Sequence, residues 1–265
     1  MARRTPPATN ASPWRWAGAG ALAGALAATL VFAPARWLAS AVELASGASV
    51  RFTDVRGSVW QGSALLVLSG GEGSAAAVAL PGRLTWRIRP RWDGLVAQLQ
   101  ADCCTPQPLQ IRASLVGWGG AQLTLADGLS HWPAGLLVGL GTPWNTVQPQ
   151  GQLTLATQGF GAQWMSGRLN LSGRMQLDAT QISSRLSTLQ PMGSYRVTLR
   201  GGSPSSFDIA TLEGSLQLKG QGQWVGHRLH FEGEASAAPD RVEALSNLLN
   251  ILGRRDGPRS IIKIG

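Results

Sequence analysis

Apolar and polar residues alternate along most of the chain beyond residue 50. In the segment 82–90, Leu84, Trp86 and Ile88 fall on one face of an extended strand, and arginines fall on the other. A period of two is typical of a β-strand with one face on a core and the other in water. The pattern predicts strands at 59–69, 82–90, 95–102, 109–116, 121–127, 151–159, 167–180, 194–202, 214–224 and 227–236. Such regular spacing favours a mainly β body, built as an antiparallel meander, a sandwich or a strongly curved sheet.

Two segments interrupt the alternation in the middle of the chain. In the segment 132–145, Pro133 stands at a first helical turn and leucines follow, which predicts a short helix ending at Gly141. The segment 182–189, which precedes Pro191, predicts a further helical turn.

A longer helix is expected near the C-terminus, over about 240–252. Asp240 can act as its N-cap, with Glu243 three residues later in a capping-box arrangement, and Gly253 suits its end. We expect this helix to cover an open end or edge of the sheet. Its apolar residues share one face: Val242, Leu245, Leu248, Leu249 and Leu252.

The N-terminal region differs from the rest, because no charged residue lies between Arg15 and Arg36. This uncharged run has about the 20 residues that a helix needs to cross a bilayer. Trp14, Trp16 and Trp37 bracket the run, and such rings prefer the headgroup region. The sequence therefore predicts a basic cytoplasmic arm over 1–15, a single transmembrane helix over 16–36, and a β-rich domain outside the cytoplasm over 37–265. We expect residues 36–49 to extend this transmembrane helix briefly.

Two alternatives compete with a retained anchor. A cleaved signal peptide has the same order of basic, apolar and small residues, and Ala33-Pro34-Ala35 resembles its cleavage site. A proline at that place is awkward for the protease, and the apolar run is long. A helix buried in a globular core is disfavoured because the run has no polar face.

Composition narrows the function further. Only 14% of the residues are charged, and 34 are glycine, which is too apolar for a disordered chain and too rich in glycine for a helical bundle. The net charge is +9, but the basic residues are spread along the chain without a cluster interleaved with aromatic residues. We therefore expect no nucleic acid as a partner. A mildly basic body fits work near anionic lipid headgroups.

Candidate chemistry is sparse. Cys103 and Cys104 are adjacent, so a disulfide between them would close a strained ring; the alternative is two small residues at a strand end. His227 and His230 lie three apart on one predicted strand and point to opposite faces, and His131 has no visible partner. The sequence shows no Gly-x-Ser-x-Gly motif with a plausible His and Asp order and no pair of carboxylates placed for acid–base catalysis. Its glycine-rich stretches lack the strand–loop–helix order of a phosphate-binding loop. We predict no enzyme, no cofactor and no metal site.

Tryptophan is the unusual residue type, with 11 copies. A Trp beside glycine on a strand usually fills the inner side of a curved sheet, so we favour core positions over a partner-binding surface. The candidates for core or interaction are Trp60, Gly62, Trp86, Trp132, Pro133, Trp144 and Trp224.

Several motifs follow one another in order over almost the whole chain. They are Gly57-Ser58-Val59-Trp60-Gln61-Gly62, Leu84-Thr85-Trp86, His131-Trp132-Pro133, Leu140-Gly141-Thr142-Pro143-Trp144-Asn145, Ser184-Arg185-Leu186-Ser187, Gly193-Ser194-Tyr195, the strand pair from Gly214 to Trp224, and Leu248-Leu249-Asn250 with Gly253-Arg254-Arg255. With these motifs the chain resembles the type II secretion system protein N family.

The resemblance implies a single-pass protein of the Gram-negative inner membrane, with its bulk in the periplasm. Such a protein is accessory to the machine that exports folded periplasmic proteins across the outer membrane, and other secretion components are its partners. The resemblance carries over no catalytic or ligand-binding residue. The pair Cys103-Cys104 departs from the family pattern and leaves a redox role undecided.

Two hypotheses follow for the body. In the first, it is a scaffold or adaptor whose sheet edges and Trp-bearing surface contact other secretion components. In the second, it is a lipid-handling envelope module, in which an apolar sheet face and the C-terminal helix cradle an acyl chain.

Overall fold

The computed structural model describes the chain except residues 1–12, 72–73, 75, 118 and 227. The described residues form one antiparallel 16-stranded sheet in the order β1-β2-β4-β5-β6-β7-β9-β10-β11-β12-β13-β14-β16-β15, with β3 on β2 and β8 on β9. The strands are β1 (Val50–Gly57), β2 (Gln61–Ser69), β3 (Ala77–Ala79), β4 (Leu84–Arg91), β5 (Gly94–Ala101), β6 (Leu109–Val116), β7 (Gly120–Leu125), β8 (Gly128–Pro133), β9 (Gln150–Met165), β10 (Arg168–Ser183), β11 (Gly193–Gly202), β12 (Ser206–Gly214), β13 (Leu216–Val225), β14 (Arg228–Ala237), β15 (Arg254–Asp256) and β16 (Arg259–Ile264).

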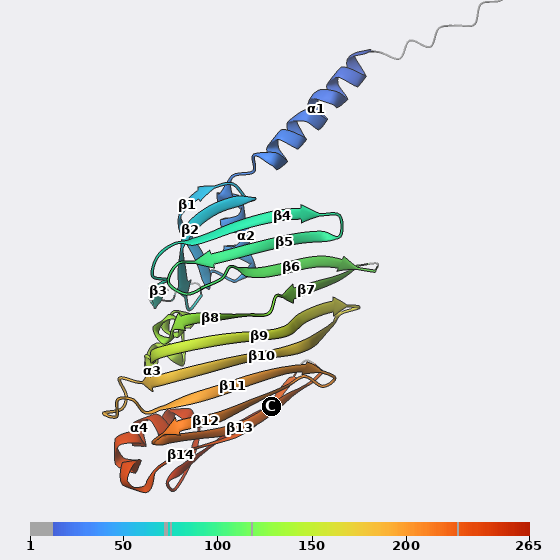
Figure 1. The fold of residues 1–265 in the computed structure, drawn as a ribbon. Helices are drawn as coiled ribbons and strands as arrows, with labels where there is room; N and C mark the ends of the chain where they lie inside the picture. Colours follow the sequence, from blue (N-terminus) through green and yellow to red (C-terminus); the bar gives the residue numbers. More distant parts are fainter. Residues whose placement is uncertain (1–12, 72–73, 75, 118, 227) are drawn as a thin grey trace, which may run out of the picture.

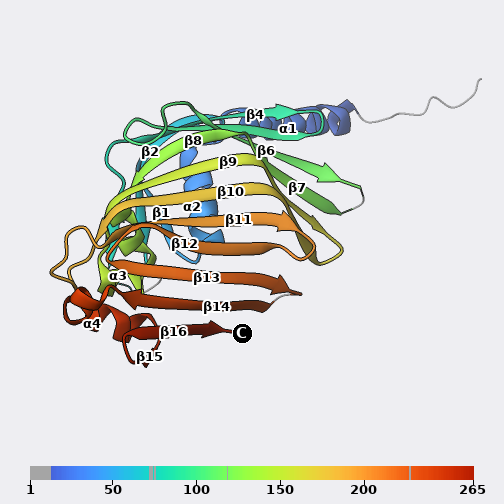
Figure 2. The same ribbon diagram turned by 60° about the horizontal axis from the view of Figure 1, so that its bottom comes forward.

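The sheet is open and strongly curved (Figures 1 and 2). The short helices gather toward one end of its strands, which leaves the opposite strand ends without a helical cover (Figure 2). They are α2 (Ala35–Ala45), η1 (Ala134–Leu140), α3 (Trp144–Val147), η2 (Pro239–Arg241) and α4 (Val242–Leu252). The mainly β, antiparallel prediction is confirmed, and of the architectures left open the structure has the curved sheet instead of two packed sheets.

The two faces of the sheet differ in chemistry. Successive side chains of a strand alternate between faces, and paired residues share a face. The apolar face, which bears Leu153, Leu177 and Tyr195, is the one that the helices cover. The polar face, which bears Asp178 and Arg196, carries ion pairs between neighbouring strands.

The core lies between the apolar face and the helices. Leu245, Leu248 and Leu249 of α4 are 0–2% exposed and pack against Leu216 and Ala235 of β13 and β14. The helix predicted over about 240–252 is thus present as α4, and it covers the sheet as expected. Burying a leucine side chain stabilises the fold by roughly 1.5–3 kcal/mol, so α4 is a main source of stability at the C-terminal end.

Three details of the helices predicted from the sequence are wrong. The N-cap of α4 is Arg241 without a side-chain cap hydrogen bond, because Asp240 lies in η2 and pairs with Arg241 at 3.0 Å. The segment 182–189 forms no helix; β10 runs to Ser183 and turns follow. The short helix expected in the segment 132–145 is present as the 3-10 helix η1, and its C-cap is Gly141 as predicted, but Trp132 and Pro133 end strand β8 instead of lying in the helix.

The N-terminal helix α1 (Pro13–Val31) stands clear of the body (Figure 1). The single helix predicted over 16–36 is interrupted, since Pro34 lacks a backbone N–H and restricts the residue before it. Judged by length and mean hydropathy, none of the helices in the described part of the chain qualifies as a membrane span. The arm predicted over 1–15 lies largely outside the described residues.

Candidate functional site

The turn between β1 and β2 holds the junction between α1 and α2. The Trp60 indole Nε1–H donates to the carbonyl oxygen of Leu30 in the last turn of α1, at 2.9 Å. The backbone N–H of Val59 donates to the carbonyl oxygen of Ala33 at 2.9 Å. Trp60, which the sequence offered as a core or interaction residue, therefore ties the projecting helix to the sheet.

Trp86 and Gly62 complete this junction. Trp86 is 3% exposed, and its Nε1–H donates to the carbonyl oxygens of Val59 at 3.1 Å and Ser58 at 3.3 Å. A Cβ on Gly62 would lie 2.5 Å from a carbon of the Trp86 ring, so only glycine lets the ring pack against β2. The structure thus brings Trp60, Gly62 and Trp86 together.

Trp132, Pro133 and Trp144 lie elsewhere in the sheet. Trp132 is half-buried, contacts two neighbouring core clusters, and donates through Nε1–H to Ser130 Oγ at 2.8 Å. Pro133 is the last residue of β8 and precedes η1. Trp144 begins α3 and is 39% exposed. These residues support the core and join no common site with Trp60.

Trp224 lies at the end of the apolar face that the helices leave uncovered. Its ring is 5.7 Å from that of Phe207. It lines a pocket of about 500 Å³ together with Trp164 and Leu169, which are 49% and 54% exposed. The pocket is therefore open to solvent at the strand ends, and its lining also includes the polar residues Arg168, Asn170 and Ser203.

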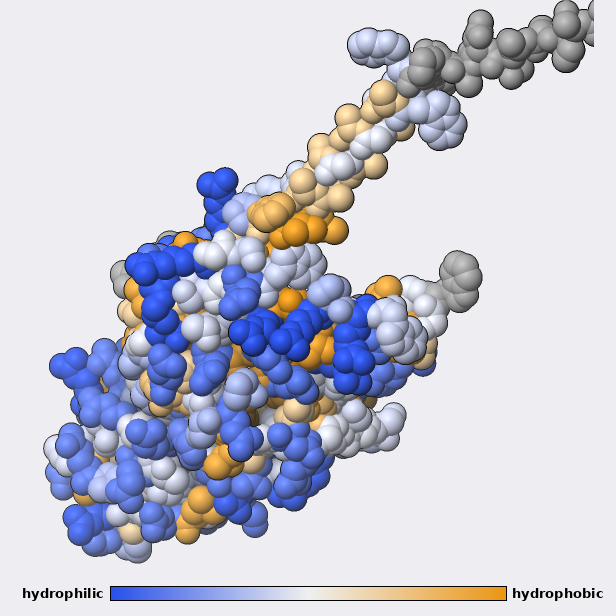
Figure 3. All heavy atoms as spheres, turned by 45° about the horizontal axis from the view of Figure 1, so that its top comes forward, coloured by the Kyte–Doolittle hydropathy of each residue, from blue (hydrophilic) through white to orange (hydrophobic). Residues whose placement is uncertain are grey.

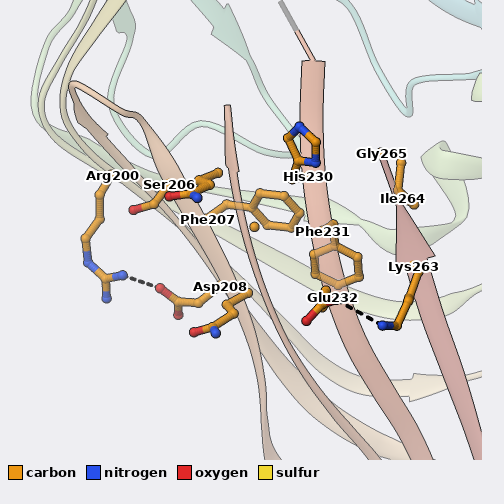
Figure 4. Close-up of a pocket in the computed structure, with 13 residues that line it drawn as sticks. Arg200, Ser206, Phe207, Asp208, His230, Phe231, Glu232, Lys263, Ile264 and Gly265 are labelled. Carbon is orange, nitrogen blue, oxygen red and sulfur yellow. Dashed lines mark hydrogen bonds and ion pairs between the residues drawn. The ribbon is translucent and has the colours of Figure 1, made fainter. Parts of the chain in front are cut away.

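A second pocket, of about 530 Å³, lies over strands β11–β14 and β16 (Figure 4). It is bordered by two ion pairs, Arg200 with Asp208 and Lys263 with Glu232. Phe207 and Phe231 also line it, and their stacked rings have centroids 5.0 Å apart. Because its charges are paired within the pocket, it has no evident preference for an anion or a cation.

A disulfide joins Cys103 to Cys104 in the turn between β5 and β6. Cys104 is 2% exposed and belongs to the core, whereas Cys103 is exposed. The backbone N–H of His131 in β8 donates to the carbonyl oxygen of Cys104 at 2.7 Å. The pair therefore lies where two parts of the sheet are joined by a main-chain hydrogen bond.

The shifted pKa values of the titratable groups have structural causes. Hydrogen bonds from Arg83, and then from Arg56, lower the pKa of the Asp54 carboxyl, and a hydrogen bond from Arg196 lowers that of Asp178. Burial raises the pKa of the Tyr195 hydroxyl. Within the described chain, no three His, Cys, Asp or Glu side chains gather into a set that could hold a metal ion, and His227 lies outside that part.

We expect Asp178→Asn to destabilise the protein by about 1 kcal/mol at neutral pH, since the pair with Arg196 is bidentate, at 2.7 and 2.8 Å, but partly exposed. In the folded state the pKa of Asp178 lies below its ordinary value of 3.8. The ion pair therefore contributes its full stabilisation above pH 3.8, and this stabilisation is lost as the pH falls through the folded-state pKa. Denaturant titrations of the Asp178→Asn variant and the wild type should therefore converge toward pH 2. Asp240→Asn, at an exposed pair, is the control; an equal effect in both variants would contradict the expectation.

The sequence did not indicate the hydrogen bond from Trp60 to Leu30 or the pocket at Trp224, because both depend on contacts between distant segments. The exposed tryptophans Trp92 and Trp164 were also missed as surface residues. Both residues lie in or next to a tight turn between strands, and this position could have indicated that their side chains are exposed.

Comparison with known protein families identifies a match over most of the chain. The model of the family described as "Type II secretion system (T2SS), protein N" matches residues 48–262, which is most of the chain and nearly all of the sheet. No curated protein and no solved structure matches the chain. The match agrees with the motifs recognised in the sequence, among them the glycine and tryptophans of the α1 junction. The chain therefore belongs to the type II secretion system protein N family and has its role in type II secretion.

Proposed function

We propose that the chain is an accessory component of the type II secretion machinery, anchored in the inner membrane by α1 with its sheet in the periplasm. There it supports the export of folded proteins across the outer membrane as a scaffold for other secretion components. Family membership supports the link to secretion, and the observation that supports the anchoring is the exposed apolar surface of α1.

The face of helix α1 that Figure 3 shows is apolar to neutral, and no charged residue lies in the helix after Arg15. Its 19 residues span about 28 Å, close to the thickness of the hydrocarbon core of a bilayer. Leu22, Leu26, Leu30 and Phe32 are 64–79% exposed, although burial of each would contribute roughly 1.5–3 kcal/mol. Alanine and glycine lower the mean hydropathy of this helix, so these few large side chains supply most of its affinity for lipid.

Co-purification from solubilised inner membranes tests the scaffold role. The tagged full chain should recover inner-membrane secretion components, and a variant with Leu22, Leu26 and Leu30 changed to serine should leave the membrane and lose them. The matched control changes Leu115, Leu129 and Leu140, exposed leucines of the body, to serine. Clean purification of the wild type without any secretion component would count against the proposal.

A second candidate function is lipid handling, which the pocket at Trp164, Leu169 and Trp224 supports. Its volume of about 500 Å³ falls within the range of small-molecule pockets. The large apolar side chains in its lining suit contact with an acyl chain, and Arg168 beside them suits an anionic headgroup. Mass spectrometry of the purified full chain tests this function. We expect a co-purified phospholipid that is lost in Leu169→Asp but kept in Leu115→Asp; a lipid-free wild type would exclude it.

A further inference from the structure

Strand β4 carries a row of arginines on the polar face. Arg87, Arg89 and Arg91 alternate along the strand and are all exposed. Arg112 of β6 joins them, because Arg89 pairs with Val96 of β5 and Val96 pairs with Arg112. This arginine patch consists of Arg87, Arg89, Arg91 and Arg112. Its first three members stand within five residues of the sequence, between Trp86 and Trp92, so the expectation that no basic cluster is interleaved with aromatic residues is wrong for this segment. Strand register adds Arg112.

The arginine patch has little opposing charge. Arg91 lies 3.9 Å from Asp93, and in the part of the chain that the structure describes none of the other three arginines forms an ion pair. Farther along the polar face most cations are paired: Arg196 with Asp178, Arg200 with Asp208, Arg259 with Glu234 and Lys263 with Glu232. Arg174 and Lys219 also lie on this face without an ion pair in the described part of the chain, but on separate strands. The arginine patch differs because its cations without an ion pair stand close together on β4 and β6.

A large apolar side chain projects beside this patch. Trp92 follows Arg91 in the turn between β4 and β5 and is 94% exposed. Exposing a tryptophan to this extent in water is unfavourable, whereas its ring is favoured at the headgroup level of a bilayer. Arginines beside an exposed Trp form a combination suited to an anionic membrane surface.

The patch also lies next to the end of α1. Trp60 accepts a hydrogen bond at its carbonyl oxygen from the Ile88 N–H, at 2.7 Å, while its indole donates to Leu30 of α1. Ile88 stands between Arg87 and Arg89 in β4. In Figure 1 α1 leaves the body above β1 and β2, and in Figure 2 it runs alongside β4; in both views it extends toward the side on which the β4–β5 turn lies. A bilayer that holds α1 therefore meets this part of the sheet first.

We infer that the arginine patch and Trp92 form a second membrane contact, which docks the sheet on the anionic phospholipid headgroups of the bilayer that holds α1. The inference rests on the proposed anchoring by α1. With docking, the protein contacts the membrane at two places, through α1 and through the arginine patch with Trp92. Two contacts fix the tilt of the sheet relative to the membrane, whereas α1 alone would let the sheet rotate about the α1 junction.

Hydrogen–deuterium exchange of the full chain in lipid nanodiscs tests this contact. We expect the segment 88–95 to exchange severalfold more slowly in discs containing phosphatidylglycerol than in discs of phosphatidylcholine alone, and high salt should abolish the difference. The variant R87Q/R89Q/R112Q should lose the protection, and Trp92→Ser should weaken it. The control R168Q/R174Q/R228Q removes the same charge from exposed arginines of other strands and should keep it. Equal melting temperatures of the variants exclude unfolding as the cause.

Equal exchange of segment 88–95 in both disc types would overturn the inference while leaving anchoring by α1 intact. Loss of the wild type from phosphatidylcholine discs would instead count against the anchoring. In that case docking is tested by measuring binding to phosphatidylglycerol vesicles. Each arginine at the surface of such a vesicle strengthens binding by about fivefold. R87Q/R89Q/R112Q should then bind on the order of 100-fold more weakly than the control variant, and equal binding would overturn the inference.

Discussion

Replacing Trp86 with alanine is expected to destabilise the protein by about 3–5 kcal/mol, one of the largest effects available to a single substitution in this fold. The side chain is 3% exposed and packs against Ala35 and Ala64, so its removal leaves a cavity between α2 and the sheet. It also leaves the carbonyl oxygens of Ser58 and Val59 without their indole donor. Urea unfolding of the full chain in detergent measures the change.

The matched control for this substitution is Trp92→Ala. The same side chain is removed, but Trp92 is 94% exposed, so the free energy of unfolding in detergent should change by less than about 0.5 kcal/mol. Similar losses in the two variants would show that Trp86 does not hold α2 and the junction to the sheet.

A second large effect is expected at the other end of the sheet, where Leu249→Ala should cost about 2–5 kcal/mol. Leu249 is 0% exposed and lies in the cluster that joins α4 to the apolar face. Ile251→Ala, two residues away on the same helix, is the control because Ile251 is 45% exposed. Its expected cost is below about 1 kcal/mol.

Thermal or urea unfolding followed by circular dichroism distinguishes these two variants. If Leu249→Ala and Ile251→Ala unfold at the same denaturant concentration, α4 is not packed on the sheet as described. If only Leu249→Ala is destabilised, the C-terminal helix closes the core, which the amphipathic pattern of the sequence had indicated.

Much of the sheet could be predicted because its strands keep a strict alternation. The strand at 82–90 corresponds to β4, and 109–116 coincides with β6. Strand β1 was missed, since a register shift between Thr53 and Arg56 interrupts its period of two. Strand β16 was missed because the adjacent Ile261 and Ile262 do not alternate with polar residues.

The candidate site was predicted less completely. Gly62 and Trp86 were both candidates for core or interaction, but their contact was not predicted, since the two residues lie on different strands. The bond from Trp60 to Leu30 joins residues 30 positions apart, and the pairing of Arg89 with Arg112 through Val96 depends on strand register. Neither has a local sequence signal, since both follow from the tertiary arrangement.

The central claim is that α1 anchors in the inner membrane a sheet that lies in the periplasm. Protease digestion of spheroplasts expressing the full chain with a C-terminal tag tests it most directly. The account predicts that external protease removes the tag and the sheet from intact spheroplasts, leaving a membrane-bound N-terminal fragment that carries α1. A tag protected until the inner membrane is lysed, or a sheet released intact by osmotic shock, would contradict it.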